Sequence, residues 1–108
     1  MTSKRPILTN RIRRVPSQFS WIDHRIVRDR HIERLTHPAA TLYLFLVAVG
    51  NAEGLSWYGD ESVMNRLSMD KELLHEARLS LIQNGMIAWR DPLYQVLSLE
   101  RSETDDRL

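Results

Sequence analysis

The sequence predicts an α+β fold that is mainly helical and carries a small antiparallel sheet, and three observations lead to this prediction. Residues 60–67 and 71–84 have apolar side chains three and four positions apart, as amphipathic helices do, with a tight turn between them. Gly85 then ends the second helix, because glycine adopts the left-handed conformation easily. A hairpin follows, with short apolar strands expected at 86–89 and 93–99 and a proline turn at 90–93.

The beginnings of three helices are predicted from side chains that accept hydrogen bonds from free backbone N–H groups. Asp60 is expected to cap the first helix of the pair and Ser68 the second. Thr36, followed by Pro38 in the first turn, predicts a further helix over 38–49. That helix is apolar almost all round, so it has to be covered on several sides by the helix pair, by residues 19–35 or by a second subunit.

The remaining segments predict less regular structure. Residues 55–58 alternate weakly and predict a small third strand, and residues 19–22 predict an apolar strand edge. Between 23 and 35 the apolar residues form two pairs that share no stripe, which predicts one broken helix or two short ones. We therefore expect three parts: a flexible basic arm over 1–18, a domain over 19–99 (extension 19–37, core 38–99), and a frayed tail over 100–108.

The composition is typical of a soluble protein with one core. The chain has 108 residues, of which 43% are hydrophobic and 27% charged. It contains no cysteine, which excludes disulfides and thiolate chemistry. The N-terminal cations are not followed by the apolar stretch of a signal peptide, and the most apolar run, 42–49, is far shorter than the roughly 18 residues that span a bilayer. We expect a cytoplasmic protein without membrane contact.

The net charge of +1 conceals an asymmetry between two parts of the chain. Residues 1–37 hold nine Lys and Arg against three Asp and Glu, whereas residues 38–108 hold six against eleven. Such an imbalance predicts that the N-terminal part meets a polyanion such as nucleic acid. The alternative is that the basic arm packs on the protein's own acidic part.

Residues 38–99 resemble the winged helix-turn-helix superfamily, most clearly in the stretch Leu74-His-Glu-Ala-Arg-Leu-Ser-Leu-Ile-Gln-Asn-Gly-Met-Ile87. That stretch is similar to the superfamily's helix that ends in a leucine, a glycine cap and an immediate apolar strand. The nearest likeness is to small bacterial domains of replication-initiation and primosome-accessory type and to regulators carried by mobile elements. The resemblance implies that residues 70–84 form the recognition helix, which enters a groove of double-stranded DNA, and that residues 88–94 form the wing.

The resemblance also implies which side chains of that helix face the groove. Leu74, Ala77 and Leu81 point inward, so the groove-facing set is Lys71, Glu72, His75, Glu76 and Leu79, with Lys71 and His75 nearest the bases. Asp70, Glu72 and Glu76 oppose the approach of phosphates, although acids in a first turn also stabilise a helix through its dipole. Pairing of Glu72 and Glu76 with Arg66 or Arg78 is an alternative role for these two carboxylates.

The cations that bind DNA are therefore expected elsewhere. Arg11, Arg13 and Arg14 are expected to lie along a groove as a basic arm does, and Arg90 to contact phosphate or the minor groove at the wing. Trp89 is predicted to cover the edge of the core rather than to stack on bases. Arg78 is predicted to be a half-buried partner in an ion pair.

The sequence does not predict an enzyme. Its four glycines form no phosphate-binding loop, no nucleophile motif is present, and His24, His31 and His37 lack metal-ligand spacing. No cofactor or metal is expected. We expect a DNA-binding regulator or accessory factor of replication or transposition. The alternative is a protein-interaction module, in which the acidic helix docks a basic partner or the helix over 38–49 forms a homodimer.

Overall fold

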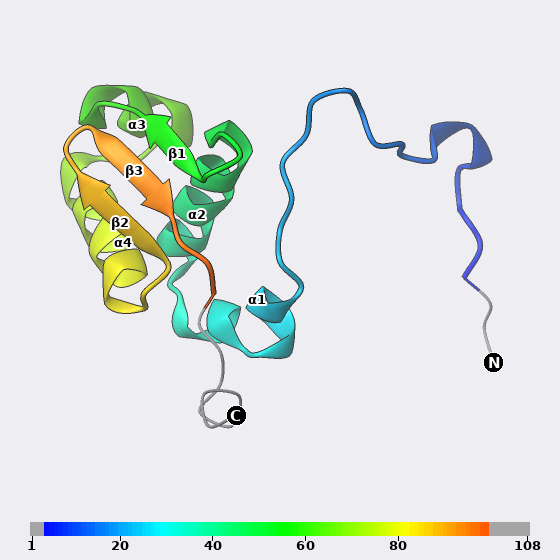
Figure 1. The fold of residues 1–108 in the computed structure, drawn as a ribbon, viewed down its shortest axis with the longest axis horizontal. Helices are drawn as coiled ribbons and strands as arrows, with labels where there is room; N and C mark the ends of the chain where they lie inside the picture. The colour runs from blue at the N-terminus through cyan, green and yellow to red at the C-terminus, as the bar shows by residue number, and fades with distance from the viewer. Residues whose placement is uncertain (1–3, 100–108) are drawn as a thin grey trace.

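The computed structural model describes residues 4–99, and the tail predicted over 100–108 lies outside these residues. The predicted fold class is confirmed, because four α-helices and a three-stranded antiparallel sheet make an α+β fold that is compatible with a winged helix (Figure 1). Two short 3-10 helices, η1 and η2, accompany them. The order is η1 (Thr9–Arg11), α1 (Arg25–Arg28), η2 (His31–Arg34), α2 (His37–Val49), β1 (Leu55–Trp57), α3 (Asp60–Leu67), α4 (Lys71–Gln83), β2 (Ile87–Arg90) and β3 (Leu93–Val96).

The sheet has the strand order β1-β3-β2, so the strand that comes last in the sequence lies in the middle. β1 pairs antiparallel with one side of β3, which confirms the predicted third strand. On the other side, β2 pairs with β3 from Ile87 opposite Val96 to Arg90 opposite Leu93. Arg90 and Leu93 form the ladder pair that closes the hairpin, so residues 91–92 are the two central residues of the turn predicted over 90–93. β3 ends at Val96, so the strand expected over 93–99 is three residues too long, although the Leu97 N–H still donates to the Met86 carbonyl at 3.0 Å.

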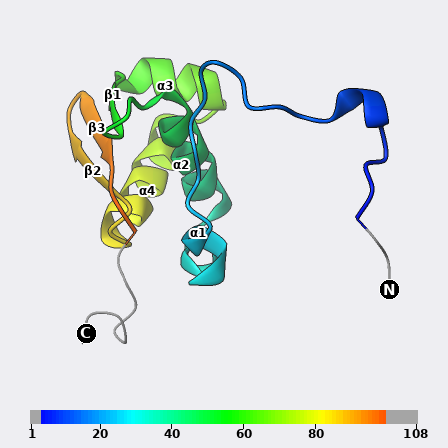
Figure 2. The ribbon, with the colours of Figure 1, turned by 45° about the vertical axis from the view of Figure 1, so that its right-hand side comes forward.

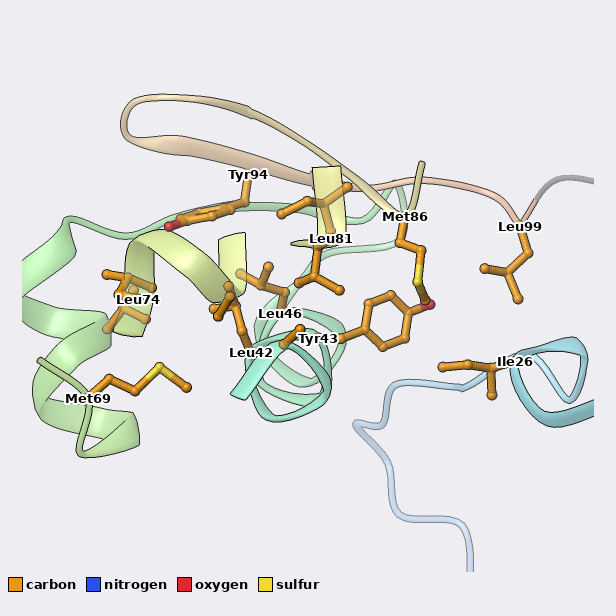
Figure 3. Packing of buried hydrophobic residues seen from close by; sticks show 14 residues of the cluster. Ile26, Leu42, Tyr43, Leu46, Met69, Leu74, Leu81, Met86, Tyr94 and Leu99 are labelled. Carbon is orange, nitrogen blue, oxygen red and sulfur yellow. The ribbon is translucent and has the colours of Figure 1, made fainter. Parts of the chain in front are cut away.

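The core lies between α2, α4 and the sheet, where Figure 3 shows the side chains of these elements meeting. Leu74, Ala77 and Leu81 of α4 have no exposed surface, which confirms the predicted inward stripe. Leu42 and Leu46 of α2 are equally buried and belong to the same cluster. The packing of α2 on α4 is thus the centre of the domain.

Thr36 begins α2 as predicted, since its hydroxyl accepts a hydrogen bond from the Ala39 N–H at 3.2 Å. The helix is covered by α4 and by β3, but Leu44 remains 57% exposed. Although α2 is apolar almost all round, one side of the helix is therefore exposed to solvent. Among the helices that the structure describes, neither α2 nor any other has the length and apolarity to cross a membrane.

The extension before α2 forms two short helices, α1 and η2, which is one of the two predicted outcomes. The chain breaks between them at Arg30, whose φ of 63° is left-handed. Ile26 of α1 reaches the core and gathers with Tyr43 and Leu99 at one end of it (Figure 3). The extension is thus part of the folded domain.

The strand edge predicted at 19–22 is wrong, because these residues form no strand. They run past α2, away from both edges of the sheet, so no strand is available to pair with them (Figure 1). The Ser20 hydroxyl donates a hydrogen bond to the Ala48 carbonyl at 3.3 Å and ties the segment to α2.

Two of the predicted helix caps are wrong. Asp60 is the first residue of α3 itself, and its carboxylate binds a side chain of α4 instead of a backbone N–H. Ser68 ends α3 in a left-handed conformation with a φ of 54°. The next residue, Met69, fills the core, so it is Asp70 that caps α4, accepting from the Leu73 N–H at 2.8 Å. The predicted stop after α4 is confirmed, because Gly85 has a φ of 69°.

The arm, by which we mean residues 4–18 from here on, lies outside the body of the domain in two views (Figures 1 and 2). Each of these residues is exposed, and the single turn of η1 is their only helical structure. The radius of gyration of 16.3 Å exceeds the roughly 13 Å of a compact domain of this length. The basic arm therefore does not pack on residues 38–99, the described portion of the acidic part of the chain.

Candidate nucleic-acid interface

α4 presents an exposed face on the side opposite its buried stripe. The side chains predicted to face a groove are all exposed there: Lys71, Glu72, His75, Glu76 and Leu79. Lys71 and His75 lie four residues apart, one above the other on the helix surface, so that both can approach the same ligand. Their contact with DNA bases remains a prediction.

Two carboxylates of this face have no cationic partner among residues 4–99. The ion pairs of these residues do not include Glu72 or Glu76, so the suggested pairing with Arg66 or Arg78 is wrong. The reason for Arg78 is geometric, because a side chain two positions from Glu76 points to another face of the helix. Glu72 lies in the first turn of α4, where a negative charge is favourable, whereas Glu76 lies beyond it.

Arg78 is a buried cation that joins α4 to α3 and to the hairpin. It is only 6% exposed, and its Nη1 donates to Asp60 Oδ1 at 2.9 Å and to the Tyr94 hydroxyl at 2.8 Å. Its guanidinium carbon lies 3.7 Å from the centre of the Trp89 ring, in a cation–π arrangement. Burial disfavours the charged form, yet the hydrogen bonds with Asp60 and Tyr94 leave the pKa of Arg78 above its ordinary value.

The same contacts fix the hairpin against α4. Trp89 is partly buried and lies with its ring centre 6.2 Å from that of Tyr94, which confirms its predicted place at the edge of the core. Arg78 is more buried than predicted, and sequence reasoning did not identify its partners. Asp60 and Tyr94 are 18 and 16 residues away along the chain, and no helix or strand spacing connects them with Arg78.

The cations predicted to bind phosphate do not belong to the group formed by Arg78, Asp60, Tyr94 and Trp89. Arg90 is exposed at the end of β2, next to the hairpin loop. The arm extends away from the helices and the sheet (Figure 2), and its arginines Arg11, Arg13 and Arg14 are exposed. The structure therefore places Lys71 and His75 on one helix face and the arm cations on a separate segment.

Residues 4–99 contain no group of three or more His, Asp or Glu side chains placed to hold a metal ion. His24 directly precedes α1, His31 lies in η2 and His37 begins α2, so the three predicted non-ligands belong to different elements. The exposed side chains of α4 offer ionic and hydrogen-bonding contact.

The fold has a counterpart among solved structures. The chain is similar to a protein whose structure is described as "Structure of Rep-DNA complex", with a TM-score of 0.56 and 17% sequence identity. The match covers 84% of this chain and 82% of the other. At this identity the likeness concerns the fold alone. No protein-family model and no curated protein matches the sequence.

Proposed function

We propose that this protein is a small DNA-binding winged-helix protein that acts as a regulator or accessory factor of replication or transposition. The proposal rests on one observation, the way in which α4 is held in the domain. One face of α4 is buried in the core and the opposite face is exposed to solvent, and Arg78 joins the helix to the hairpin. A helix held in this way can enter a major groove while a neighbouring hairpin contacts the backbone. The likeness in fold to a protein solved with DNA supports the proposal, which includes no catalytic step and no cofactor.

The cations of the arm supply the affinity that α4 lacks. DNA binding depends largely on neutralised phosphates, and the exposed face of α4 offers Lys71 against two carboxylates. The arm holds five Lys and Arg and no acid between residues 4 and 18. In the proposed complex, Lys71 and His75 lie nearest the bases, and Arg90 and the arm hold the backbone.

The test is the salt dependence of binding to duplex DNA. Each lost phosphate contact lowers the slope of log affinity against log salt by roughly 0.9, so replacing Arg11, Arg13 and Arg14 by Ala should reduce that slope by about 2–3 on any sequence. The matched control replaces three exposed arginines of the segment from α1 to η2, Arg28, Arg30 and Arg34, by Ala. Wild-type protein that binds no duplex DNA at low salt contradicts the proposed function, and equal slopes for both variants contradict the role of the arm.

A second function, docking of a basic protein partner, is favoured by one observation: Glu72 and Glu76 are exposed and have no partner among the described residues. Replacing both by Gln should strengthen DNA binding if α4 faces phosphates, because it removes repulsion. The same change should weaken a complex with a basic protein if the carboxylates are a docking surface. The control is Gln at Glu53 and Glu61, which are exposed elsewhere.

A further inference from the structure

The sheet has an outer face that no described helix covers. The helices lie against its other face, as Figure 2 shows, and Ser56 and Tyr94 are buried on that side. Side chains alternate between the two faces along a strand, so the residues next to these two belong to the outer face. With the partners that the strand register places opposite them, the outer face consists of Leu55, Trp57, Ala88, Arg90, Leu93 and Gln95. It therefore holds one cation and no acid.

Trp57, Leu93 and Arg90 form one row across the outer face. Leu93 of the central strand lies opposite Trp57 of β1 and, on its other side, opposite Arg90 of β2. Neighbouring strands are about 4.8 Å apart, so the row from Trp57 to Arg90 is roughly 10 Å long. A stacked nucleic-acid strand advances about 3.4 Å per nucleotide. The row therefore has the length of about two to three nucleotides.

Trp57 offers an open aromatic surface on a fixed strand. Its side chain is 72% exposed, more than any other large hydrophobic side chain between residues 38 and 99. Among residues 4–99 it takes part in no ring contact or cation–π contact. The backbone next to it is held firmly, because the Tyr58 N–H donates to the Pro92 carbonyl at 3.1 Å and the Tyr58 ring packs on Phe45 with ring centres 5.0 Å apart. A rigid, exposed ring is suited to stack on a base.

The neighbours of Trp57 supply the polar groups that a nucleic acid requires. Arg90 is exposed and forms no ion pair with another residue of the described chain, so its guanidinium is available for a phosphate. Gln95 is exposed in the adjacent row, and its amide both donates and accepts, as the edge of a base does. The nearest acid in the sequence, Asp91, lies in the hairpin loop beyond the paired residues. The charge of the outer face is thus complementary to a phosphate backbone.

Stacking on Trp57 selects for a base that is not part of a double helix. In a duplex each base is stacked between its neighbours, and it reaches a protein ring only after unstacking. The bases of a single strand turn out at little cost and stack on aromatic side chains. A sheet that exposes an aromatic ring beside polar and cationic groups is the surface on which sheet-based single-strand-binding modules hold their bases.

We propose that the outer face of the sheet binds single-stranded DNA, with an unpaired base stacked on Trp57 and a neighbouring phosphate bound by Arg90. This site goes beyond the duplex contacts of α4 and rests on the proposed function only in the choice of DNA over RNA. Arg90 is shared with the duplex contacts of the hairpin, whereas Trp57 is not used by them. Substitution of Trp57 is therefore the decisive test.

Fluorescence anisotropy of a labelled oligothymidylate of about 12 nucleotides, a length typical of small single-strand-binding modules, measures this binding at low salt. Trp57→Val removes the ring but keeps a residue that favours strands, so it should weaken binding by about tenfold to a hundredfold. Trp57→Phe keeps a ring and should bind within about threefold of wild type. The matched control is Trp21→Val, which removes a 70% exposed tryptophan outside the sheet and should leave the affinity unchanged.

The same proteins are titrated with duplex DNA, to which Trp57→Val should bind as wild type does. Wild-type protein that binds duplex DNA but no oligothymidylate overturns the single-strand site and leaves the proposed function intact, whereas the reverse result contradicts the proposed function alone. Equal affinities of Trp57→Val and Trp57→Phe for oligothymidylate overturn the stacking role, and so does equal weakening of duplex binding by Trp57→Val. Tighter binding of an oligouridylate of the same length would show an RNA site and overturn the choice of DNA.

The salt dependence tests the phosphate contact separately. On a single strand each lost phosphate contact lowers the slope of log affinity against log salt by roughly 0.7, so Arg90→Gln should reduce the slope on oligothymidylate by about that amount. The control is Arg66→Gln, an exposed arginine of α3 that lies outside the sheet. Equal slopes for the two variants overturn the assignment of a phosphate to Arg90.

Discussion

Replacement of Arg78 by methionine probes the link between α4 and the hairpin. The substitution keeps most of the aliphatic volume and removes the guanidinium that lies over Trp89. It leaves the Tyr94 hydroxyl without its donor at 2.8 Å and the Asp60 carboxylate without its partner at 2.9 Å. The perturbation thus affects three elements through a single side chain.

The expected cost follows from the exposure of each partner. A buried hydroxyl that loses its hydrogen bond costs about 1–3 kcal/mol, and Tyr94 has no exposed surface. Loss of a cation–π contact adds about 1–2 kcal/mol. The Asp60 side chain is 39% exposed, so water replaces much of its lost interaction. The variant also no longer pays the desolvation cost of burying a guanidinium, which offsets part of the loss in stability. We expect Arg78→Met to lower the free energy of unfolding by about 2–4 kcal/mol.

Urea denaturation of four proteins measures this effect: wild type, Asp60→Asn, Arg78→Met and the double variant. Because the two residues touch, the double variant should cost about 1–2 kcal/mol less than the sum of the single variants. The control is Arg66→Met, an exposed arginine of α3 that should change stability by less than about 0.5 kcal/mol. If Arg78→Met is as stable as the control, or if the two single costs simply add, our account of this cluster is refuted.

Two further predictions concern the core and the extension. Leu81→Ala should lower the free energy of unfolding by about 2–5 kcal/mol, because the side chain is fully buried, and a thermal midpoint within a degree or two of wild type would contradict this. Side-chain and backbone hydrogen bonds from Arg25 hold the pKa of Asp23 at about 2, below its ordinary value of 3.8. The stabilisation from Asp23 is thus present above pH 3.8 and is lost as the pH falls towards 2. NMR titration should find this pKa, and Arg25→Gln should return it towards 3.8, whereas an unchanged value would contradict the assigned cause.

The parts of the fold that the sequence predicts correctly depend on residues close together in the chain. The inward stripe of α4 follows from side chains three and four positions apart, and the cap at Thr36 follows from one hydroxyl and a free N–H three residues on. Gly85 is recognisable because few other residues accept its φ of 69°. For such features the sequence contains nearly all of the physical information.

The wrong predictions have tertiary causes. Asp60 is of a residue type that commonly caps helices, but its carboxylate binds the buried cation Arg78, 18 residues away. Ser68 is also of a capping type, but burial of Met69 in the core moves the start of α4 to Lys71. The candidate site shows the same limit, because the exposure of Lys71 follows from helix periodicity, whereas the attachment of the hairpin through Arg78 does not.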